Sequence, residues 1–247
     1  MDQGPQRRYE GGNRLIDGLE PADYDAVARS LTVMHAAEAS TGISYGDPIG
    51  AVYFPMGALF SVLVEVDGGD CYEVDTVGRD GLVGGELLLG ATLASRSVIC
   101  QGGGSFAQMP VDAFEGQLAA APAFRRAVGQ ALQLQWFRTQ QTIACNFAHT
   151  LAERCARWIL MNRDEAGTDE FPLRLEFLSM MVGVRPHLIA EPLAALQGIG
   201  AIRYADGVVR VLSEIGLREA VCECYTVPHH HARRLGMLRR EGRLTAD

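Results

Sequence analysis

The chain has 247 residues, of which 48% are hydrophobic and 21% are charged. This ordinary globular composition allows one large or two modest domains and excludes a disordered or fibrous protein. The longest apolar stretch, at 82–94, is interrupted by Gly and Glu and is shorter than the roughly 20 residues of a membrane helix. The first residues lack the apolar segment of a secretory signal. The sequence therefore predicts a cytoplasmic protein with no membrane partner.

The net charge of −8 is distributed unevenly along the chain. Before residue 125 the chain has 6 Arg against 17 acidic residues, and from there on it has 16 Arg against 13 acidic residues. An acidic surface repels polyanions, whereas a basic surface attracts phosphates. Nucleic acid is therefore expected to meet the second half of the chain rather than the first.

Strand-like segments dominate residues 49–112. Short apolar runs such as AVYF and SVLVEV alternate with Gly- and Asp-containing turns, among them DGGD at 67–70. Regular spacing of short strands is typical of an all-β sandwich or barrel. The sequence predicts such a unit in the first half of the chain.

A long amphipathic helix is predicted at 122–148. Pro122 suits a first helical turn, and from Phe124 to Phe147 the only helix-weakening residue is Gly129. Apolar side chains recur three, four or seven residues apart, at Leu132, Trp136, Phe137, Ile143 and Phe147. A second helix follows and closes with a Gly soon after its last apolar residue.

The C-terminal half has the pattern of a winged helix-turn-helix. In LSMMVGVRPHLIAEPLAALQGIGAIRY, residues 178–204, one helix leads through a turn at Gly183 to a second helix. Asp206-Gly207 then separates two β-prone runs, which is a strong hairpin signal. Helix, turn, helix and hairpin in this order predict a winged module.

Pro192 is unusual within the second of these helices. Inside a helix, proline removes one hydrogen bond and clashes with the carbonyl four residues back, at a cost on the order of 3 kcal/mol. We therefore expect a kink halfway along this helix. Because recognition helices are presented rigidly to the major groove, the kink is expected to re-aim the residues that follow it.

Six strings occur along residues 14–226, in the order strands, long helix and winged module. They are VYFPMGALFSVLVE, VGRDGLVGGELLLG, ACNFAHTLAERCARWIL, LSMMVGVR, GAIRYADGVVRVL and VCECY. In this order they resemble the Crp/Fnr family, the bacterial regulators related to the cyclic-AMP receptor protein and to Fnr. The resemblance implies an α+β fold with a cyclic-nucleotide-binding-like β-roll (14–121), a dimerisation helix (122–148), a winged helix-turn-helix (149–228) and a basic tail (229–247).

The resemblance also implies a ligand site. In the nucleotide-binding members, a Gly-Glu-Leu turn is followed ten residues after the Glu by Arg-Ser, and this chain has the same spacing. Turn N–H groups and a guanidinium suit a phosphate, the Glu takes the ribose hydroxyl, and two helix residues lie near the base. A cyclic mononucleotide or dinucleotide is the implied ligand, and a surface salt bridge between Glu86 and Arg96 is the alternative. The candidate ligand residues are Gly85, Glu86, Leu87, Arg96, Ser97, Thr139 and Gln140.

The family's long helix pairs with a second copy about a two-fold axis. The resemblance thus implies a homodimer, with packing against the same chain's β-roll as the alternative for the apolar residues of that helix. Double-stranded DNA is the implied partner of the winged module, although two positive charges common in the family are missing. The candidate dimer residues are Leu132, Trp136, Ile143 and Phe147, and the candidate DNA contacts are Arg185, His187, Glu191 and Arg203.

The sequence shows no metal, haem or iron–sulfur signature. Its six cysteines lack paired CxxC knuckles, so buried reduced thiols are expected. The pair Cys222 and Cys224, with one residue between them, is a weak metal or redox signal. The N-terminal cysteine cluster of iron–sulfur members is absent, and Cys71 or His35 alone is a weak haem ligand.

These patterns favour a DNA-binding regulator over an enzyme, because no nucleophile–base set or paired carboxylates stand out. The alternative is a divergent relative with weakened DNA binding that acts as a nucleotide-sensing or protein-binding module. Residues 229–244 are expected to form a solvated, partly helical tail, or else to add phosphate contacts. Those contacts would come from Arg233, Arg234, Arg239 and Arg240.

Overall fold

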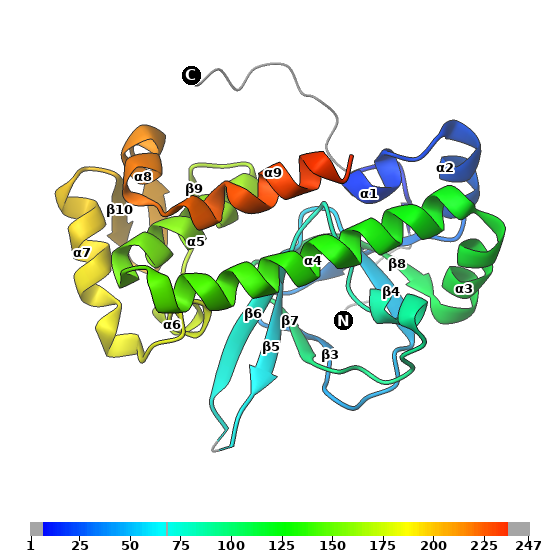
Figure 1. Cartoon of the computed structure of the whole chain (residues 1–247), viewed down its shortest axis with the longest axis horizontal. Coiled ribbons are helices and arrows are strands. Elements are labelled where there is room, and N and C mark those ends of the chain that lie inside the picture. Colours follow the sequence, from blue (N-terminus) through cyan, green and yellow to red (C-terminus); the bar gives the residue numbers. More distant parts are fainter. Residues whose placement is uncertain (1–6, 68, 237–247) are drawn as a thin grey trace.

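A computed structural model describes residues 7–67 and 69–236. Two β-sheets form a roll, one long helix crosses this roll, and a helical module with a small sheet lies at the far end of the helix (Figure 1). The α+β class and the order of β-roll, long helix and winged module are confirmed. Among the helices of the described ranges, none has both the length and the apolar character that crossing a bilayer requires.

The β-roll consists of two antiparallel sheets with the strand orders β1-β2-β8-β4 and β3-β7-β5-β6. Between them, the rings of Tyr53, Phe60 and Phe106 pack with centroids 5.3–6.3 Å apart, which gives this unit an aromatic core. The strands are β1 (Arg7–Arg8), β2 (Thr32–Ala36), β3 (Thr41–Ile43), β4 (Ala51–Pro55), β5 (Phe60–Glu65), β6 (Cys71–Val77), β7 (Ser97–Cys100) and β8 (Gly104–Pro110).

Short helices close the ends of the roll and lead into the long helix. They are α1 (Arg14–Asp17), α2 (Pro21–Ala28), the 3-10 helix η1 (Gly85–Leu89) and α3 (Val111–Ala120). The buried Asn13 ties the first of them to the roll, because its amide donates to the carbonyls of Pro55 at 2.9 Å and Gly81 at 3.1 Å.

The long helix α4 (Pro122–Ala148) buries one face and leaves the opposite face in solvent. In the middle of the buried face, the guanidinium of Arg138 lies 3.2 Å from Asp75 and 3.6 Å from Asp80. A buried charge is tolerated when it is paired in this way, so these ion pairs hold α4 against β6 and the turn that follows it. The buried residues of α4 are Phe124, Val128, Ala131, Leu134, Arg138 and Cys145.

The winged module begins with α5 (Leu151–Ala166). Thr150 and Glu153 form a capping box at its start, which satisfies two otherwise free N–H groups. In the wing, Asp206 and Gly207 have φ angles of 51° and 75°, the left-handed pair that a two-residue hairpin turn requires. The other elements are β9 (Glu170–Pro172), α6 (Leu175–Val182), η2 (Pro186–Leu188), α7 (Ala190–Gly198), β10 (Ile202–Ala205), β11 (Val208–Val211), α8 (Glu214–Ala220) and η3 (Glu223–Tyr225).

Pro192 does not kink a helix, so that expectation is wrong. The segment after Gly183 is divided into the 3-10 turn η2 and the helix α7, which starts only at Ala190. Pro192 is the third residue of α7, and N–H groups in a first turn have no intrahelical partner to lose. The proline therefore marks the beginning of α7, and its ring is buried within the module.

The expectation of a solvated, partly helical tail is right in part for residues 229–236, since they are helical as far as Arg234 and most of their side chains are exposed, but the segment also packs against α4. Helix α9 (Val227–Arg234) runs alongside α4 (Figure 1). The ring of His231 stacks on Phe137 with centroids 4.1 Å apart, and the Gln130 amide donates to the carbonyl of Leu235 at 2.8 Å. Arg233 and Arg234 stay exposed on this helix, whereas Arg239 and Arg240 lie outside the described residues.

Candidate functional site

A cavity of about 620 Å³ lies between the β-roll and α4. This is within the range of about 300–1,000 Å³ that is usual for small-molecule sites. Apolar side chains of the β-roll and of η1 line one side of the cavity, and α4 lines the other side with residues that include Leu132, Trp136 and Thr139. The cavity can therefore hold a small ligand against the long helix.

Three of the seven predicted ligand residues line this cavity, namely Glu86, Arg96 and Thr139. They come from η1, the segment before β7 and α4, so the fold brings together residues that are up to 53 positions apart in the sequence. No ion pair joins Glu86 to Arg96 within the described ranges, which leaves the surface salt bridge without support. The other four candidates, Gly85, Leu87, Ser97 and Gln140, are not part of the cavity wall.

Gly85 and Ser97 shape the site instead of lining it. A Cβ at Gly85 would lie 2.9 Å from a methyl carbon of Leu82 and 3.0 Å from one of Leu132, so any larger residue would require these two leucine side chains to shift. The hydroxyl of Ser97 accepts a hydrogen bond from the N–H of Tyr45 at 3.1 Å, and it thereby fixes the strand that starts next to Arg96.

The predicted DNA contacts lie on the exposed side of the winged module. Arg185 precedes η2, His187 is inside it, Glu191 is the second residue of α7, and Arg203 lies on β10 of the wing. All four side chains are exposed. Because α7 begins after Arg185 and His187, these two side chains extend from the turn before this helix and not from the helix itself.

The predicted dimer residues divide into two groups. Leu132 is half-buried and packs against the core of its own chain. Trp136, Ile143 and Phe147 are 69%, 54% and 90% exposed, and their spacing of seven and four residues places them along one line of α4. These three residues, called the α4 stripe below, are not covered by the β-roll.

Glu73 on β6 is a buried acid that the sequence analysis did not single out. It is 8% exposed and shares a small cavity with Arg157, Trp158 and Met181, where the β-roll meets the winged module. Burial raises the pKa of its carboxyl from 4.5 to about 8, although the Thr76 hydroxyl donates to it at 2.6 Å. The β-roll and the winged module thus contact each other around the Glu73 carboxyl, and its raised pKa favours the protonated form of this group at neutral pH.

Glu73→Gln is expected to make the protein more stable than the unmodified chain at about pH 8.5, by roughly 3–5 kcal/mol. Between pH 4.5 and about 8 only the folded state holds this proton, so the unmodified protein loses stability as the pH rises through that window. Below the window both states are protonated, and the difference vanishes. Thermal unfolding at about pH 4.5 and pH 8.5 measures the effect.

Glu115→Gln, at an exposed position of α3, is the matched control and should leave the pH profile unchanged. A stability difference between Glu73→Gln and the unmodified chain that is equal at both pH values would contradict the assigned titration.

Solved structures share this architecture. FixK2 from Bradyrhizobium japonicum aligns with a TM-score of 0.67 at 12% identity, over 78% of this chain and 98% of its own. The c-di-GMP-responsive global regulator CLP from Xanthomonas campestris aligns with a TM-score of 0.65 at 14% identity, over 78% and 100%. The CRP/FNR-family transcriptional regulator TTHA1359 from Thermus thermophilus aligns with a TM-score of 0.62 at 17% identity, over 76% and 97%.

The chain has the Crp/Fnr fold. Neither a protein-family model nor a curated protein matches its sequence. The Crp/Fnr fold of this chain is therefore established by the likeness of its structure to these proteins.

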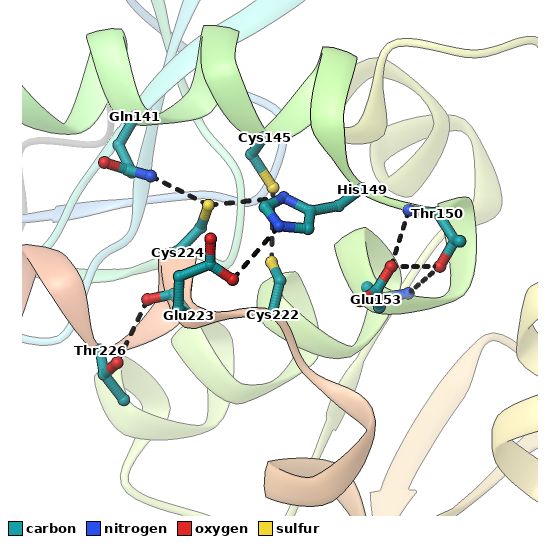
Figure 2. Close-up of polar contacts among 9 residues, drawn as sticks. All are labelled: Gln141, Cys145, His149, Thr150, Glu153, Cys222, Glu223, Cys224 and Thr226. Atoms are coloured by element: carbon teal, nitrogen blue, oxygen red, sulfur yellow. Dashed lines mark hydrogen bonds and ion pairs between the residues drawn. The ribbon is translucent and has the colours of Figure 1, made fainter.

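Within this Crp/Fnr fold, four side chains that sequence reasoning treated separately come together. They are Cys145, His149, Cys222 and Cys224 (Figure 2). The sulfurs of Cys145 and Cys222, both free thiols separated by 77 residues of chain, lie 3.6 Å apart, and their hydrogen bond lowers the pKa of Cys145. The available signals were a Cys and a His four residues apart and the Cys-x-Cys pair, but only the fold shows that these two pairs meet.

Proposed function

We propose that the protein is a homodimeric transcription regulator that binds double-stranded DNA through its winged helix-turn-helix and responds to a cyclic nucleotide in the β-roll. The observation that carries this proposal is the winged module of a Crp/Fnr fold, with Arg185, His187 and Arg203 exposed at its turn and wing. A DNA partner implies that the protein acts in the cytoplasm.

The shape of the module supports DNA as its partner. In helix-turn-helix proteins, the first residues of the recognition helix contact base edges while flanking groups contact phosphates. Here Arg185 stands just before η2, the turn that leads into α7, so its guanidinium is suited to a guanine edge. Arg203 on the wing is suited to a phosphate. Glu191 at the start of α7 can only accept hydrogen bonds, which favours a cytosine amino group over a phosphate.

The position of the cavity supports control by a ligand. Arg96 offers a permanent positive charge at the cavity wall, Thr139 offers a hydroxyl from α4, and Trp136 belongs both to the wall and to the α4 stripe. A ligand there would contact the helix through which two copies of the chain are proposed to pair. The regulator CLP, which has the same fold, is responsive to c-di-GMP, so cyclic dinucleotides are to be tested beside mononucleotides.

Selection of genomic DNA fragments by the purified full-length protein tests the function. We expect an inverted-repeat motif, because a two-fold dimer presents two identical recognition helices about one helical turn apart. Arg185→Ala should weaken binding by roughly ten- to a hundred-fold and relax one position in each half-site. Binding is measured by fluorescence anisotropy at several salt concentrations, with and without each nucleotide.

Arg29→Ala, an exposed arginine of the β-roll, is the matched control and should bind like the unmodified protein. Recovery of no motif, together with binding that disappears at moderate salt, would contradict specific DNA recognition. That outcome would favour the alternative of a divergent nucleotide-sensing or protein-binding module.

A further inference from the structure

The end of α4 and the segment between α8 and α9 share a cluster of three thiols and one imidazole. Cys145 lies in the last turn of α4 and His149 directly after it, while Cys222 and Cys224 flank Glu223 (Figure 2). The three sulfur atoms and a ring nitrogen all lie within 4.8 Å of one another. All three cysteines are buried and form a small cluster of their own, separate from the large apolar cores.

The spacing of these atoms fits a single tetrahedral metal ion. Zinc binds thiolate sulfur at about 2.3 Å and imidazole nitrogen at about 2.0 Å, so the ligand atoms of one site lie roughly 3.5–3.8 Å apart. Here the sulfurs of Cys145 and Cys222 are 3.6 Å apart, and the sulfur of Cys224 lies 3.6 Å from Nδ1 of His149. An iron–sulfur cluster separates its cysteines further, because iron and sulfide atoms stand between them.

The groups around the cluster orient these four side chains. Nε2 of His149 lies 3.2 Å from a carboxylate oxygen of Glu223, and this contact turns the opposite ring nitrogen, Nδ1, toward the thiols. A carboxylate on the outer nitrogen is the usual partner of a metal-bound histidine, because it fixes the ring and its tautomer. The Gln141 amide donates to the sulfur of Cys224 at 3.0 Å, a contact that favours the thiolate over the thiol.

We propose that Cys145, His149, Cys222 and Cys224 bind one Zn²⁺ ion in a closed structural site. Three thiolates and one imidazole form a known structural zinc ligand set, with no position open for catalysis. The ion would join the end of the long helix to the segment that leads into α9, and so fix the winged module relative to α4. The proposal is independent of whether the module binds DNA or the β-roll binds a nucleotide.

Metal analysis of the full-length protein, purified with a reductant and without chelators, tests this site. We expect one zinc per chain, released when a mercurial reagent blocks the thiols. Exchange with Co²⁺ should give the intense visible bands of a tetrahedral cobalt ion together with thiolate-to-cobalt charge transfer. These spectra report the ligand set in the unmodified protein, so the test does not depend on a variant that folds.

Variants then assign the ligands. Cys222→Ser and Cys224→Ser should each lower the zinc content at least ten-fold after dialysis against a weak chelator. Cys71→Ser, at a cysteine outside the cluster, should keep one zinc per chain. A strong chelator should lower the unfolding temperature of the unmodified protein and of Cys71→Ser, because metal binding is coupled to folding.

Three results would overturn the proposal. The first is a zinc content far below one per chain with no tetrahedral cobalt spectrum. The second is full zinc retention in both cluster variants. The third is a disulfide between Cys145 and Cys222 in protein prepared under reductant, because sulfurs joined in a disulfide cannot bind the ion. Mass spectrometry would detect it as two cysteines that an alkylating reagent modifies only after reduction.

Discussion

Replacing Trp136 with Asp should convert the proposed dimer into monomers. The α4 stripe exposes three large apolar side chains, at 69% for Trp136, 54% for Ile143 and 90% for Phe147. Large apolar side chains exposed along one line of a helix are typical of interaction sites, and a two-fold axis along α4 would bury them against a second copy. An unpaired carboxylate in that interface is costly, so we expect the dimer dissociation constant to rise at least a thousand-fold, about 4 kcal/mol.

Light scattering and sedimentation on matched variants check this prediction. Ile143→Asp should have the same effect, and it separates the interface from the cavity because Ile143 does not line that cavity. Ile215→Asp is the control, since Ile215 is 72% exposed on α8, away from α4. Circular dichroism should show all three variants folded, because these side chains are exposed in the single chain. A monomer for the unmodified protein would refute the dimer.

The long helix shows what local sequence can predict. Its start at Pro122 and its length follow from residue type alone, because no other proline interrupts it and its apolar residues keep a helical period. The wing hairpin was equally predictable, since Asp206-Gly207 is among the few pairs that adopt left-handed angles at low cost. Both features depend on residues close together in the chain.

Pro192 and α9 show where such reasoning ends. The effect of a proline depends on where its helix begins, and the sequence did not show that η2 ends before Ala190 and leaves Pro192 in a first turn. The HHHARR segment was expected to belong to a solvated, partly helical tail. It is helical, as part of α9, but one face packs against α4, where Phe137 stacks on the ring of His231. Tertiary contacts decided both cases.

The candidate sites were predictable to different degrees. Glu86 and Arg96 were found from the spacing of a family motif, and the fold places both on the cavity wall. The group of Cys145, His149, Cys222 and Cys224 was not found, because its two halves lie in different elements 77 residues apart. Glu73 was missed because the sequence of β6 does not show which of its side chains the winged module covers.

Arg96→Ala should weaken binding of a cyclic nucleotide by about a hundred-fold, which corresponds to two charge-assisted hydrogen bonds. Three charged side chains line the cavity in the described part of the chain, namely Asp75, Glu86 and Arg96. Asp75 is paired with Arg138. Without Arg96, a phosphate would therefore meet the unpaired carboxylate of Glu86 and no positive charge.

Titration calorimetry with cyclic mononucleotides and cyclic dinucleotides, on full-length protein, measures this effect. Arg29→Ala should bind the nucleotide like the unmodified chain. It removes one positive charge, as Arg96→Ala does, but Arg29 lies outside the cavity wall. Thr139→Val should lose about ten-fold, because it removes one hydroxyl from α4 and keeps the shape of the wall. Equal affinity in Arg96→Ala and the unmodified protein would show that the nucleotide binds elsewhere. If no cyclic nucleotide produces heat, the cyclic-nucleotide assignment is wrong. The ligand of the 620 Å³ cavity would then be a less polar molecule without a phosphate, in keeping with its largely apolar wall.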